Sequence, residues 1–276
     1  MKAFRGEPSI FASARSEERR AELEVKRLTL RFGGITALNK IDLTVNSGEL
    51  VAVIGPNGAG KTSLLNCITG YYKPQEGQIS FNGEEITNLS THHLTALGIG
   101  RTYQNIELFP GLTVLSNMLL ARHIHCNYSV GLASLFSPSV RKEEVSHRKV
   151  LEELIDFLEM QSIRKQLVGS LPYGLRKRVE LGRALALEPK LLVLDEPFAG
   201  MTLEEKEDMV RFLKELHEAW GQTIILVEHD MSVVMSISQR VAVLDFGVKI
   251  AEGSPDFVQA HPQVIEAYLG ETATIE

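Results

Sequence analysis

The segment GPNGAGKTS, residues 55–63, combines the residue types that bind a polyphosphate. It fits the pattern G-x-x-x-x-G-K-S/T and lies between an apolar run, LVAVI, and a helical pattern, LLNCITGYY. Glycine lets backbone N–H groups turn toward a phosphate, and the helix that begins near Lys61 adds the positive end of its dipole. We therefore predict a nucleotide site formed by Gly55, Pro56, Asn57, Gly58, Ala59, Gly60, Lys61, Thr62 and Ser63.

Lys61 and Thr62 have separate roles in such a loop. The Lys61 ammonium would reach the β- and γ-phosphates, the Thr62 hydroxyl would bind Mg²⁺, and Ser63 would support the same end of the nucleotide. The alternative is a glycine-rich turn that binds no ligand. The complete motif, in its setting of strand, loop and helix, favours the nucleotide site.

Two adjacent carboxylates follow a second apolar run in LLVLDEP, residues 191–197. An acid at a strand end commonly binds the metal in phosphoryl-transfer sites, so Asp195 is the expected Mg²⁺ ligand. Glu196 would activate a water for attack on the γ-phosphate. Such a pair is otherwise more often solvated or caps the next helix, but the phosphate loop favours the catalytic interpretation.

His229 ends a third apolar run in TIILVEHD, residues 223–230. Parallel sheets gather ligand-binding groups at the carboxyl ends of their strands. A lone histidine is more often structural, yet its position at the same edge as Asp195 favours contact with the γ-phosphate or the attacking water.

The elements that must position these groups are indicated by hydrophobic patterning. The runs at 191–197 and 223–230 are continuously apolar, which is typical of parallel strands covered by helices on both faces. The residues from Leu23 onward alternate as strands with turn signals between them, and they predict a mostly antiparallel region: LEVKRLTLRF, IDLTVNSGELVAVIG and GQISFNGEEI.

Helical periodicity occurs at residues 142–160 and again at 203–220. The first stretch indicates a helical subdomain at about 90–180 and places one apolar stripe at Leu151, Leu154, Ile155 and Leu158. The second joins the two buried strands and carries Val210, Leu213, Leu216 and Trp220. The predicted fold class is therefore α/β, with a parallel core sheet, an antiparallel β subdomain and an α-helical subdomain.

Composition restricts the class of protein further. The chain has 276 residues, 44% of them hydrophobic and 23% charged, and no apolar run approaches the length of about 18 residues that crosses a bilayer. A net charge of −6 argues against nucleic acid as a partner. Cys67 and Cys126 show no metal-ligand spacing, which is consistent with two reduced thiols. We expect residues 1–22 to be a charged, flexible lead-in and 271–276 a tail, with one domain at 23–270.

Together the motifs resemble the ATP-binding subunit of an ABC transporter, a P-loop NTPase of ABC type, over about residues 23–270. The resemblance rests on the phosphate loop, LLVLDEP, the signature LPYGLRKRVELGRALA, and three further residues that it assigns. Phe32 would stack on adenine, Gln104 would be the glutamine that contacts Mg²⁺ and the attacking water, and His229 the switch histidine. The stretches FGGITAL, GYYKPQEGQISFNG and HPQVIEAYLGE resemble the branched-chain amino-acid uptake group within that family.

The resemblance implies a pair of ATPase chains with ATP bound between the phosphate loop of one chain and the signature of the other. The helix beginning near residue 172 would then direct its N-terminus at the γ-phosphate. Pro172 replaces the usual serine and suits a first helical turn, so the contact would fall to the backbone of Tyr173 and Gly174. Thr202 stands where the family usually has an aspartate that links the two sites. This atypical signature leads us to expect a second, non-identical ATPase subunit, with a homodimer as the alternative.

The remaining partners also follow from the resemblance. It implies membrane permease subunits, an external solute-binding protein that acts indirectly, and a peripheral location on the cytoplasmic face of the inner membrane. We expect the permease to dock in a groove lined by apolar residues of the stretch GRTYQNIELFPGLTV: Ile106, Leu108, Phe109, Leu112 and Val114.

Three other functions compete with amino-acid import. An ATPase of a lipopolysaccharide or lipid export system shares DEPFAGM and the YLGE ending. A soluble ABC ATPase acting on ribosomes or DNA usually has tandem cassettes or a coiled-coil insertion, and this chain has a single set of motifs. A small-molecule kinase would give no role to the signature helix.

Overall fold

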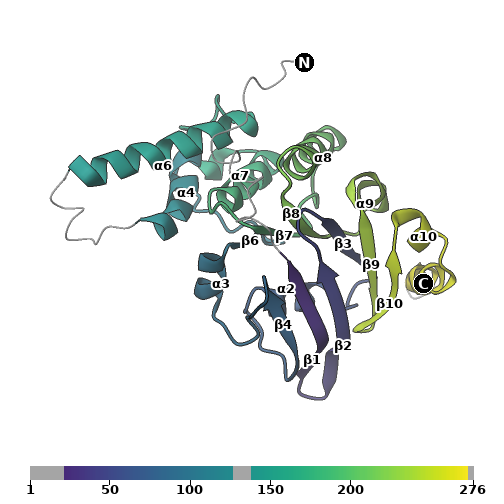
Figure 1. Ribbon diagram of the computed structural model, residues 1–276. Helices are drawn as coiled ribbons and strands as arrows, with labels where there is room; N and C mark the ends of the chain where they lie inside the picture. The colour runs from purple at the N-terminus through teal and green to yellow at the C-terminus, as the bar shows by residue number, and fades with distance from the viewer. Residues whose placement is uncertain (1–21, 127–137, 273–276) are drawn as a thin grey trace.

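The computed structural model describes residues 22–126 and 138–272 (Figure 1). The expected lead-in, apart from Glu22, and the last four residues of the expected tail lie outside these ranges. Residues 271 and 272 of that tail belong to the last helix, α11, Pro262–Thr272.

A six-stranded sheet forms the centre of the fold, in the order β10-β9-β3-β8-β7-β6. Neighbouring strands are parallel except for the edge strand β10, which is antiparallel to β9. The strands are β3 (Leu50–Ile54), β6 (Ile99–Arg101), β7 (Leu191–Asp195), β8 (Thr223–Val227), β9 (Arg240–Asp245) and β10 (Val248–Gly253). The central parallel strands predicted at 191–197 and 223–230 are β7 and β8.

Both faces of the central strands are buried. Alternate residues of β8 enter different cores: Ile224 and Leu226 pack on one face of the sheet, and Ile225 and Val227 pack on the other. This two-sided burial explains why the runs are apolar without alternation. It also fixes the ends of β7 and β8 side by side at one edge, where Asp195 pairs in register with Val227.

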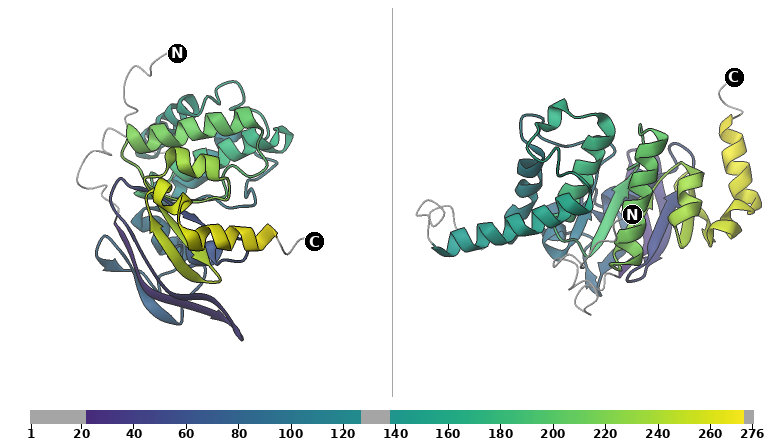
Figure 2. Two further views of the ribbon diagram at one scale, coloured as in Figure 1. Left: turned by 90° about the vertical axis from the view of Figure 1, so that its right-hand side faces the viewer. Right: turned by 90° about the horizontal axis from the view of Figure 1, so that it is seen from above.

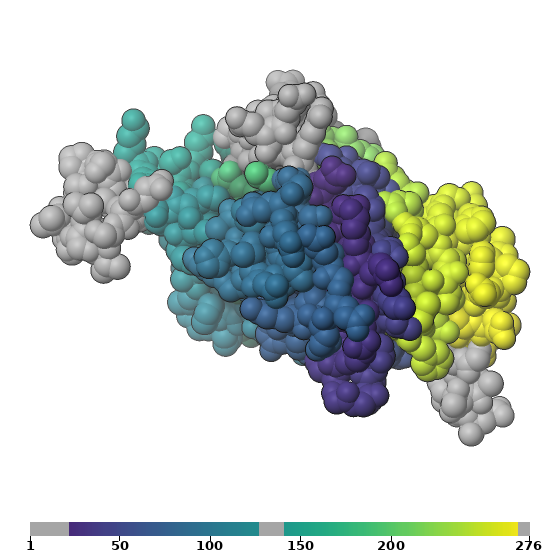
Figure 3. All heavy atoms as spheres, turned by 60° about the horizontal axis from the view of Figure 1, so that its bottom comes forward, coloured from purple at the N-terminus to yellow at the C-terminus, as the bar shows by residue number. Residues whose placement is uncertain are grey.

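A second, four-stranded sheet is antiparallel and has the order β2-β1-β4-β5. Its strands are β1 (Leu23–Phe32), β2 (Ile35–Val45), β4 (Glu76–Phe81) and β5 (Glu84–Glu85). This sheet, purple to blue in Figure 3, lies beside the yellow-green segment that contains β10, and β2 contacts β10.

The prediction that the opening strands form one antiparallel region is wrong for Leu50–Ile54. This strand pairs parallel with β8 and β9 in the central sheet. It is wholly buried and apolar, as a central parallel strand should be, whereas β2 alternates buried and exposed residues. The chain therefore changes sheets at the turn after Val45.

Helices surround the sheets, and α6 extends away on the side opposite α11 (Figure 2). The remaining helices with their bounds are α2 (Lys61–Ile68), α3 (Thr91–Leu97), α4 (Val114–Ala121), η2 (Arg122–His125), α6 (Pro138–Phe157), η3 (Val168–Ser170), α7 (Tyr173–Leu185), α8 (Leu203–Glu218), α9 (Met231–Ile237) and α10 (Pro255–Gln259). Within the described ranges, none of these helices is both long and apolar enough to pass through a bilayer.

The helical region between β6 and β7 packs α4 and α6 against α7. The stripe predicted from periodicity is fully buried there: Leu151, Leu154, Ile155 and Leu158 have no exposed surface. On α8 the prediction is less accurate, because Val210 is half-buried while Met209 and Phe212 take the core positions beside Leu213.

Candidate functional site

The loop between β3 and α2 is built from glycines that no other residue can replace without strain. Gly55 has φ 145° and Gly60 has φ 103°. A Cβ at Gly55 would lie 2.0 Å from the Leu244 carbonyl oxygen, and one at Gly60 would lie 2.6 Å from that of Ala37. The loop is therefore pressed against neighbouring backbone on one side. Gly60 caps α2 without a side chain, which leaves the helix N-terminus available to an anion.

Lys61, the first residue of α2, folds back against the start of this loop. Its Nζ donates hydrogen bonds of 2.7 Å to the Gly55 carbonyl and 2.9 Å to the Pro56 carbonyl. The side chain is buried, with 7% of its surface exposed. The lysine thus holds the two ends of the loop together and keeps a positive charge beneath it.

A hollow of about 440 Å³ opens above the loop. Its lining includes residues 57–63 together with Gln104 and Glu196. The Gln104 Nε2 donates a hydrogen bond of 2.8 Å to the Glu196 Oε2. The structure therefore brings three separately predicted segments to one place. Thr36, Ala37 and two exposed apolar residues, Ile35 and Phe246, also line the hollow, and the sequence reasoning did not find them.

Glu196 has a strained backbone, with φ 47° in the left-handed region that disfavours residues with a side chain. Its N–H donates to the Val227 carbonyl at 2.9 Å, which ties it to the end of β8. Strain of this kind costs about 1–3 kcal/mol and is concentrated at functional positions. The conformation directs the Glu196 side chain to the hollow instead of continuing the strand.

Asp195 is almost completely buried and forms an ion pair with Arg101, with 2.9 Å between Oδ2 and Nη2. Arg101 also donates to Asn66 of α2 and to Thr69, the C-cap of that helix, so it connects the carboxylate to the end of α2. Burial raises the pKa of Asp195, and the Arg101 charge opposes the rise. The Asp195 Oδ1 has no hydrogen-bond partner among the described residues. A carboxylate oxygen without such a partner matches the oxygen ligands that Mg²⁺ prefers.

Glu228 is a buried residue of the site that the sequence reasoning overlooked. Its carboxylate accepts hydrogen bonds from three backbone N–H groups, those of Phe198, His229 and Asp230. Burial raises the pKa of Glu228, and these N–H groups act in the opposite direction. The carboxylate therefore joins the segment after β7 to the segment after β8. Only its place at the end of an apolar run could have indicated it.

His229 and Phe32 are not among the residues that line the hollow above the phosphate loop. The His229 side chain is 60% exposed, and its Nδ1 is 3.8 Å from the Glu228 Oε2. The Phe32 ring packs edge-on against Tyr72, with 5.0 Å between ring centroids, and is 45% exposed. Both side chains are accessible for contact with a nucleotide or a second chain.

The signature helix α7 begins at Tyr173, which agrees with the predicted start near residue 172, although Pro172 lies one position before the first helical turn. Pro172 is the N-cap, with an extended ψ of 156°. Tyr173 lies beside Gly200, where a Cβ would come within 3.0 Å of its ring. A Cβ at Gly174 would lie 2.2 Å from the Glu205 carboxylate. Tyr173 and Gly174 thus pack against the start of α8, away from the hollow of their own chain.

Thr202 has a structural role as the N-cap of α8. Its side chain accepts from the Glu205 N–H, and Glu205 accepts in return from the Thr202 N–H, which completes a capping box. The residue that replaces the usual aspartate therefore starts the helix against which Gly174 packs.

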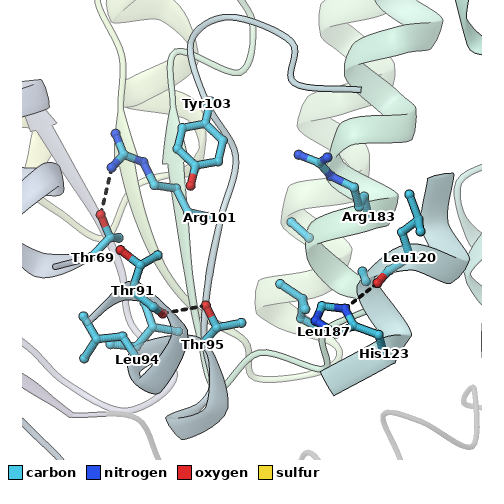
Figure 4. A pocket seen from close by; sticks show the side chains of 13 residues that line it. Thr69, Thr91, Leu94, Thr95, Arg101, Tyr103, Leu120, His123, Arg183 and Leu187 are labelled. Carbon is cyan, nitrogen blue, oxygen red and sulfur yellow. Dashed lines mark hydrogen bonds between the residues drawn. The ribbon is translucent and has the colours of Figure 1, made fainter. Parts of the chain in front are cut away.

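A separate cleft of about 240 Å³ lies between α3 on one side and α4, η2 and α7 on the other (Figure 4). Its lining combines apolar side chains with polar and charged ones, the latter being Thr69, Thr91, Thr95, Arg101, Tyr103, His123 and Arg183. The apolar groove expected from residues 106–114 is not this cleft. Val114 is fully buried in the core and Leu108 packs against it, whereas Phe109 and Leu112 are exposed.

A phosphate-binding loop between a parallel strand and a helix, with an acidic pair at the end of another parallel strand of the same sheet, defines a P-loop nucleoside triphosphatase. Comparison with known proteins specifies the family. The family model described as "ABC transporter" matches residues 38–199, and one described as "Branched-chain amino acid ATP-binding cassette transporter" matches residues 248–274. The chain belongs to the ABC transporter family and is an ABC-type ATPase that hydrolyses ATP.

Individual relatives agree with this assignment. The chain is 40% identical over 250 residues to the high-affinity branched-chain amino acid transport ATP-binding protein BraF of Pseudomonas aeruginosa, covering 90% of this chain and 98% of BraF. It resembles the ADP conformation of MJ1267, an ATP-binding cassette of an ABC transporter, with a TM-score of 0.78, 33% identity and coverage of 91% and 99%. It also resembles the dimeric bacterial cassette MJ0796, with a TM-score of 0.72, 27% identity and coverage of 84% and 98%.

Proposed function

We propose that this ABC ATPase drives the import of branched-chain or closely related amino acids. The observation that carries the proposal is the 40% identity to BraF over almost the whole of both chains. The separate match of residues 248–274 to a branched-chain amino-acid transporter model supports it from a different part of the sequence.

Leucine uptake by cells that lack the chain tests this proposal. Wild type should restore uptake, and Lys61→Ala, which removes the charge beneath the phosphate loop, should not. If cells that lack the chain take up leucine normally but fail to export a lipid-linked substrate, the result would instead support the lipid-export alternative.

At the phosphate loop, we propose that the N–H groups of residues 57–63 and the Lys61 ammonium bind the β- and γ-phosphates of ATP. Phe32 stacks on the adenine. Thr62, Asp195 and Gln104 would provide the oxygens that hold Mg²⁺, which would neutralise phosphate charge when bound. Arg101 fixes the orientation of the Asp195 carboxylate through their ion pair.

Glu196 is the proposed general base for the attacking water. Its strained backbone places the carboxylate at the hollow, and the Gln104 side-chain amide orients it. His229 contacts the γ-phosphate or the water once the site closes. A general base supplies about 100-fold to 10,000-fold of the rate, so Glu196 should be the most sensitive of these side chains.

The proposed working unit contains two ATPase chains. Tyr173 and Gly174 lie at the N-terminus of α7 and away from their own hollow, which suits contact with the γ-phosphate held by another chain. Pro172 provides neither hydroxyl nor N–H there, and we propose a second, non-identical ATPase as the partner. Comparing ATP turnover of the purified chain with turnover beside that partner tests this point, and full activity of a homodimer would contradict it.

Permease subunits are the proposed membrane partners, and the cleft between α3 and α7 is their proposed docking site. The chain would then lie on the cytoplasmic face of the inner membrane, and an external solute-binding protein would act through the permease. A negative charge added to the cleft, His123→Glu, should reduce transport while leaving the ATPase activity of the free chain unchanged, because His123 lies outside the phosphate-loop hollow.

A further inference from the structure

Three charged residues of α7 hold the backbone of the segment that follows β6. Lys177, Glu180 and Arg183 are spaced three residues apart, so they lie along one face of the helix. Each forms a hydrogen bond with a main-chain group of residues 103–107. We call this segment, Tyr103–Glu107, the glutamine segment, because it carries Gln104.

Lys177 is buried, with 2% of its surface exposed. Its Nζ donates hydrogen bonds of 2.9 Å to the Gln104 carbonyl and 3.3 Å to the Tyr103 carbonyl. The same Nζ lies 3.6 Å from the Glu180 Oε2. The Lys177 ammonium therefore donates its hydrogen bonds to the glutamine segment, and the Glu180 carboxylate pairs with its charge.

Glu180 is as buried as Lys177 and binds the N–H of Tyr103, whose carbonyl binds Lys177. Its Oε1 accepts a hydrogen bond of 3.2 Å from the Tyr103 N–H. Further along the helix, Arg183 donates to the Glu107 carbonyl, and Figure 4 shows its side chain extending from α7 toward the segment that carries Tyr103. The N–H and the carbonyl of Tyr103 are thus both fixed to α7.

Packing alone does not require charges at these positions. A buried ion pair can often be replaced by apolar residues of similar volume without loss of stability. Lys177 and Glu180 instead provide the donors and the acceptor that hold main-chain groups of a segment without regular structure. Their effect is to make the backbone at Gln104 follow α7.

The side chain of Gln104 points the other way, to the Glu196 carboxylate that follows β7. We infer that Lys177 and Glu180 are positioning residues. By fixing the glutamine segment to α7, they hold the Gln104 side chain within hydrogen-bond distance of the Glu196 carboxylate. The inference rests on the proposed roles of Gln104 and Glu196. Because the N-terminus of α7 is also the proposed contact with the second nucleotide, a shift of α7 changes the Gln104–Glu196 contact in the same chain.

A double-mutant cycle between Lys177 and Gln104 tests this inference. The full-length chain, in the assembly with which it copurifies, is compared as wild type, Lys177→Met, Gln104→Ala and the double variant. We expect Lys177→Met to lower kcat about tenfold and to change the affinity for ATP by less than about twofold. In the Gln104→Ala background the same substitution should cost nothing further, because its effect passes through Gln104.

Two further variants separate positioning from general disruption. Lys177→Arg keeps the charge and donors, so it should recover most of the lost turnover. Lys249→Met removes a paired lysine on β10 that does not line the hollow, and should leave turnover unchanged. If Lys177→Met does not fold, Glu180→Met, which removes the acceptor for the Tyr103 N–H but has a similar length, is used in the same cycle and should show the same dependence on Gln104.

Additive losses in the cycle, or a fall in thermal stability without a fall in kcat, would overturn the inference while leaving the proposed function intact. A Gln104→Ala variant with normal turnover would also overturn it, because Lys177 could not act through that side chain. The leucine-uptake assay does not depend on either result, so failure of the proposed cargo is detected separately.

Discussion

The Gln104 side-chain amide lies 2.8 Å from the Glu196 carboxylate, although the two residues are 92 positions apart. Gln104 follows β6 and is held by α7, whereas Glu196 follows β7 and is held by β8. This hydrogen bond therefore connects the signature helix to the edge of the central sheet, beside the phosphate loop. It gives both side chains a defined orientation.

Replacing Glu196 by glutamine should reduce ATP turnover by about 100-fold or more, because the amide cannot accept a proton from water. ATP binding should persist, since the phosphate loop is unchanged, and the ATP-bound pair of chains should accumulate. Phosphate release and nucleotide retention measure the two effects. Glu207→Gln, on α8, is the matched control, and equal losses in both variants would contradict the assignment.

Alanine at Gly55 should destabilise the chain by about 3 kcal/mol or more, because its Cβ would meet the Leu244 carbonyl at 2.0 Å. Gly58 is the control, since it also has a positive φ but has open space where a Cβ would lie. Gly58→Ala should cost only about 1 kcal/mol, the backbone strain itself. Urea unfolding of the two variants provides the comparison, and equal costs would show that close packing of the loop is unimportant.

Alanine at Gly174 should weaken the capping box of α8. The added Cβ would displace the Glu205 carboxylate, which caps the Thr202 N–H, at a cost of about 1 kcal/mol. In the Glu205→Ala background, Gly174→Ala should cost much less, because the displaced group is gone. Unfolding measurements on the four chains test this, and independent effects of the two substitutions would disagree with the structure.

Removing the Arg101 side chain should be strongly destabilising. Arg101→Met leaves the buried Asp195 charge without a partner, which costs about 3–5 kcal/mol. Asp195→Asn in the same chain should recover part of the loss. Arg31→Met breaks an ion pair whose side chains are about half exposed, and should cost less than about 1 kcal/mol. Similar unfolding free energies for both arginine variants would argue against the burial of this pair.

The Lys206–Asp230 ion pair predicts a pH-dependent contribution to stability. Hydrogen bonds from Lys206 and Ser232 lower the pKa of Asp230 to about 2, below an unfolded value of about 3.9. Its stabilising contribution is therefore complete above about pH 5 and is lost as the pH falls from about 4 toward 2. Asp230→Asn keeps a helix-capping side chain but removes the charge.

The difference in unfolding free energy between wild type and Asp230→Asn should be about 1 kcal/mol at pH 6 and should shrink below about pH 4. Urea titrations across this range measure it. A difference that is constant with pH would mean that the loss comes from the cap and not from the ion pair.

The phosphate loop and the buried strands were predictable because local chemistry determines them. The backbone conformation at positions 55 and 60 requires glycine, and burial on both faces of the sheet requires the apolar runs of β7 and β8. The pairing of Leu50–Ile54 was not predictable from its own residues. Its partners, β8 and β9, come from more than 170 positions later in the chain.

The site residues that were missed share one property: their role depends on tertiary contacts. Arg101 has no motif of its own and is recognised only because it meets Asp195 and α2. Glu228 likewise depends on backbone N–H groups brought from two strand ends. The exact start of α7 at Pro172 was not predictable either, because a proline suits both an N-cap with extended ψ and a first helical turn, and local sequence does not distinguish them.

The central claim is that two ATPase chains enclose each ATP between a phosphate loop and the N-terminus of α7. A cryo-EM structure of the Glu196→Gln chain with ATP and Mg²⁺, in the assembly with which it copurifies, tests it most directly. The account predicts a γ-phosphate between Lys61 of one ATPase and the α7 N-terminus of the other. Nucleotide bound by a single chain, with Tyr173 and Gly174 remote from every γ-phosphate, would contradict it.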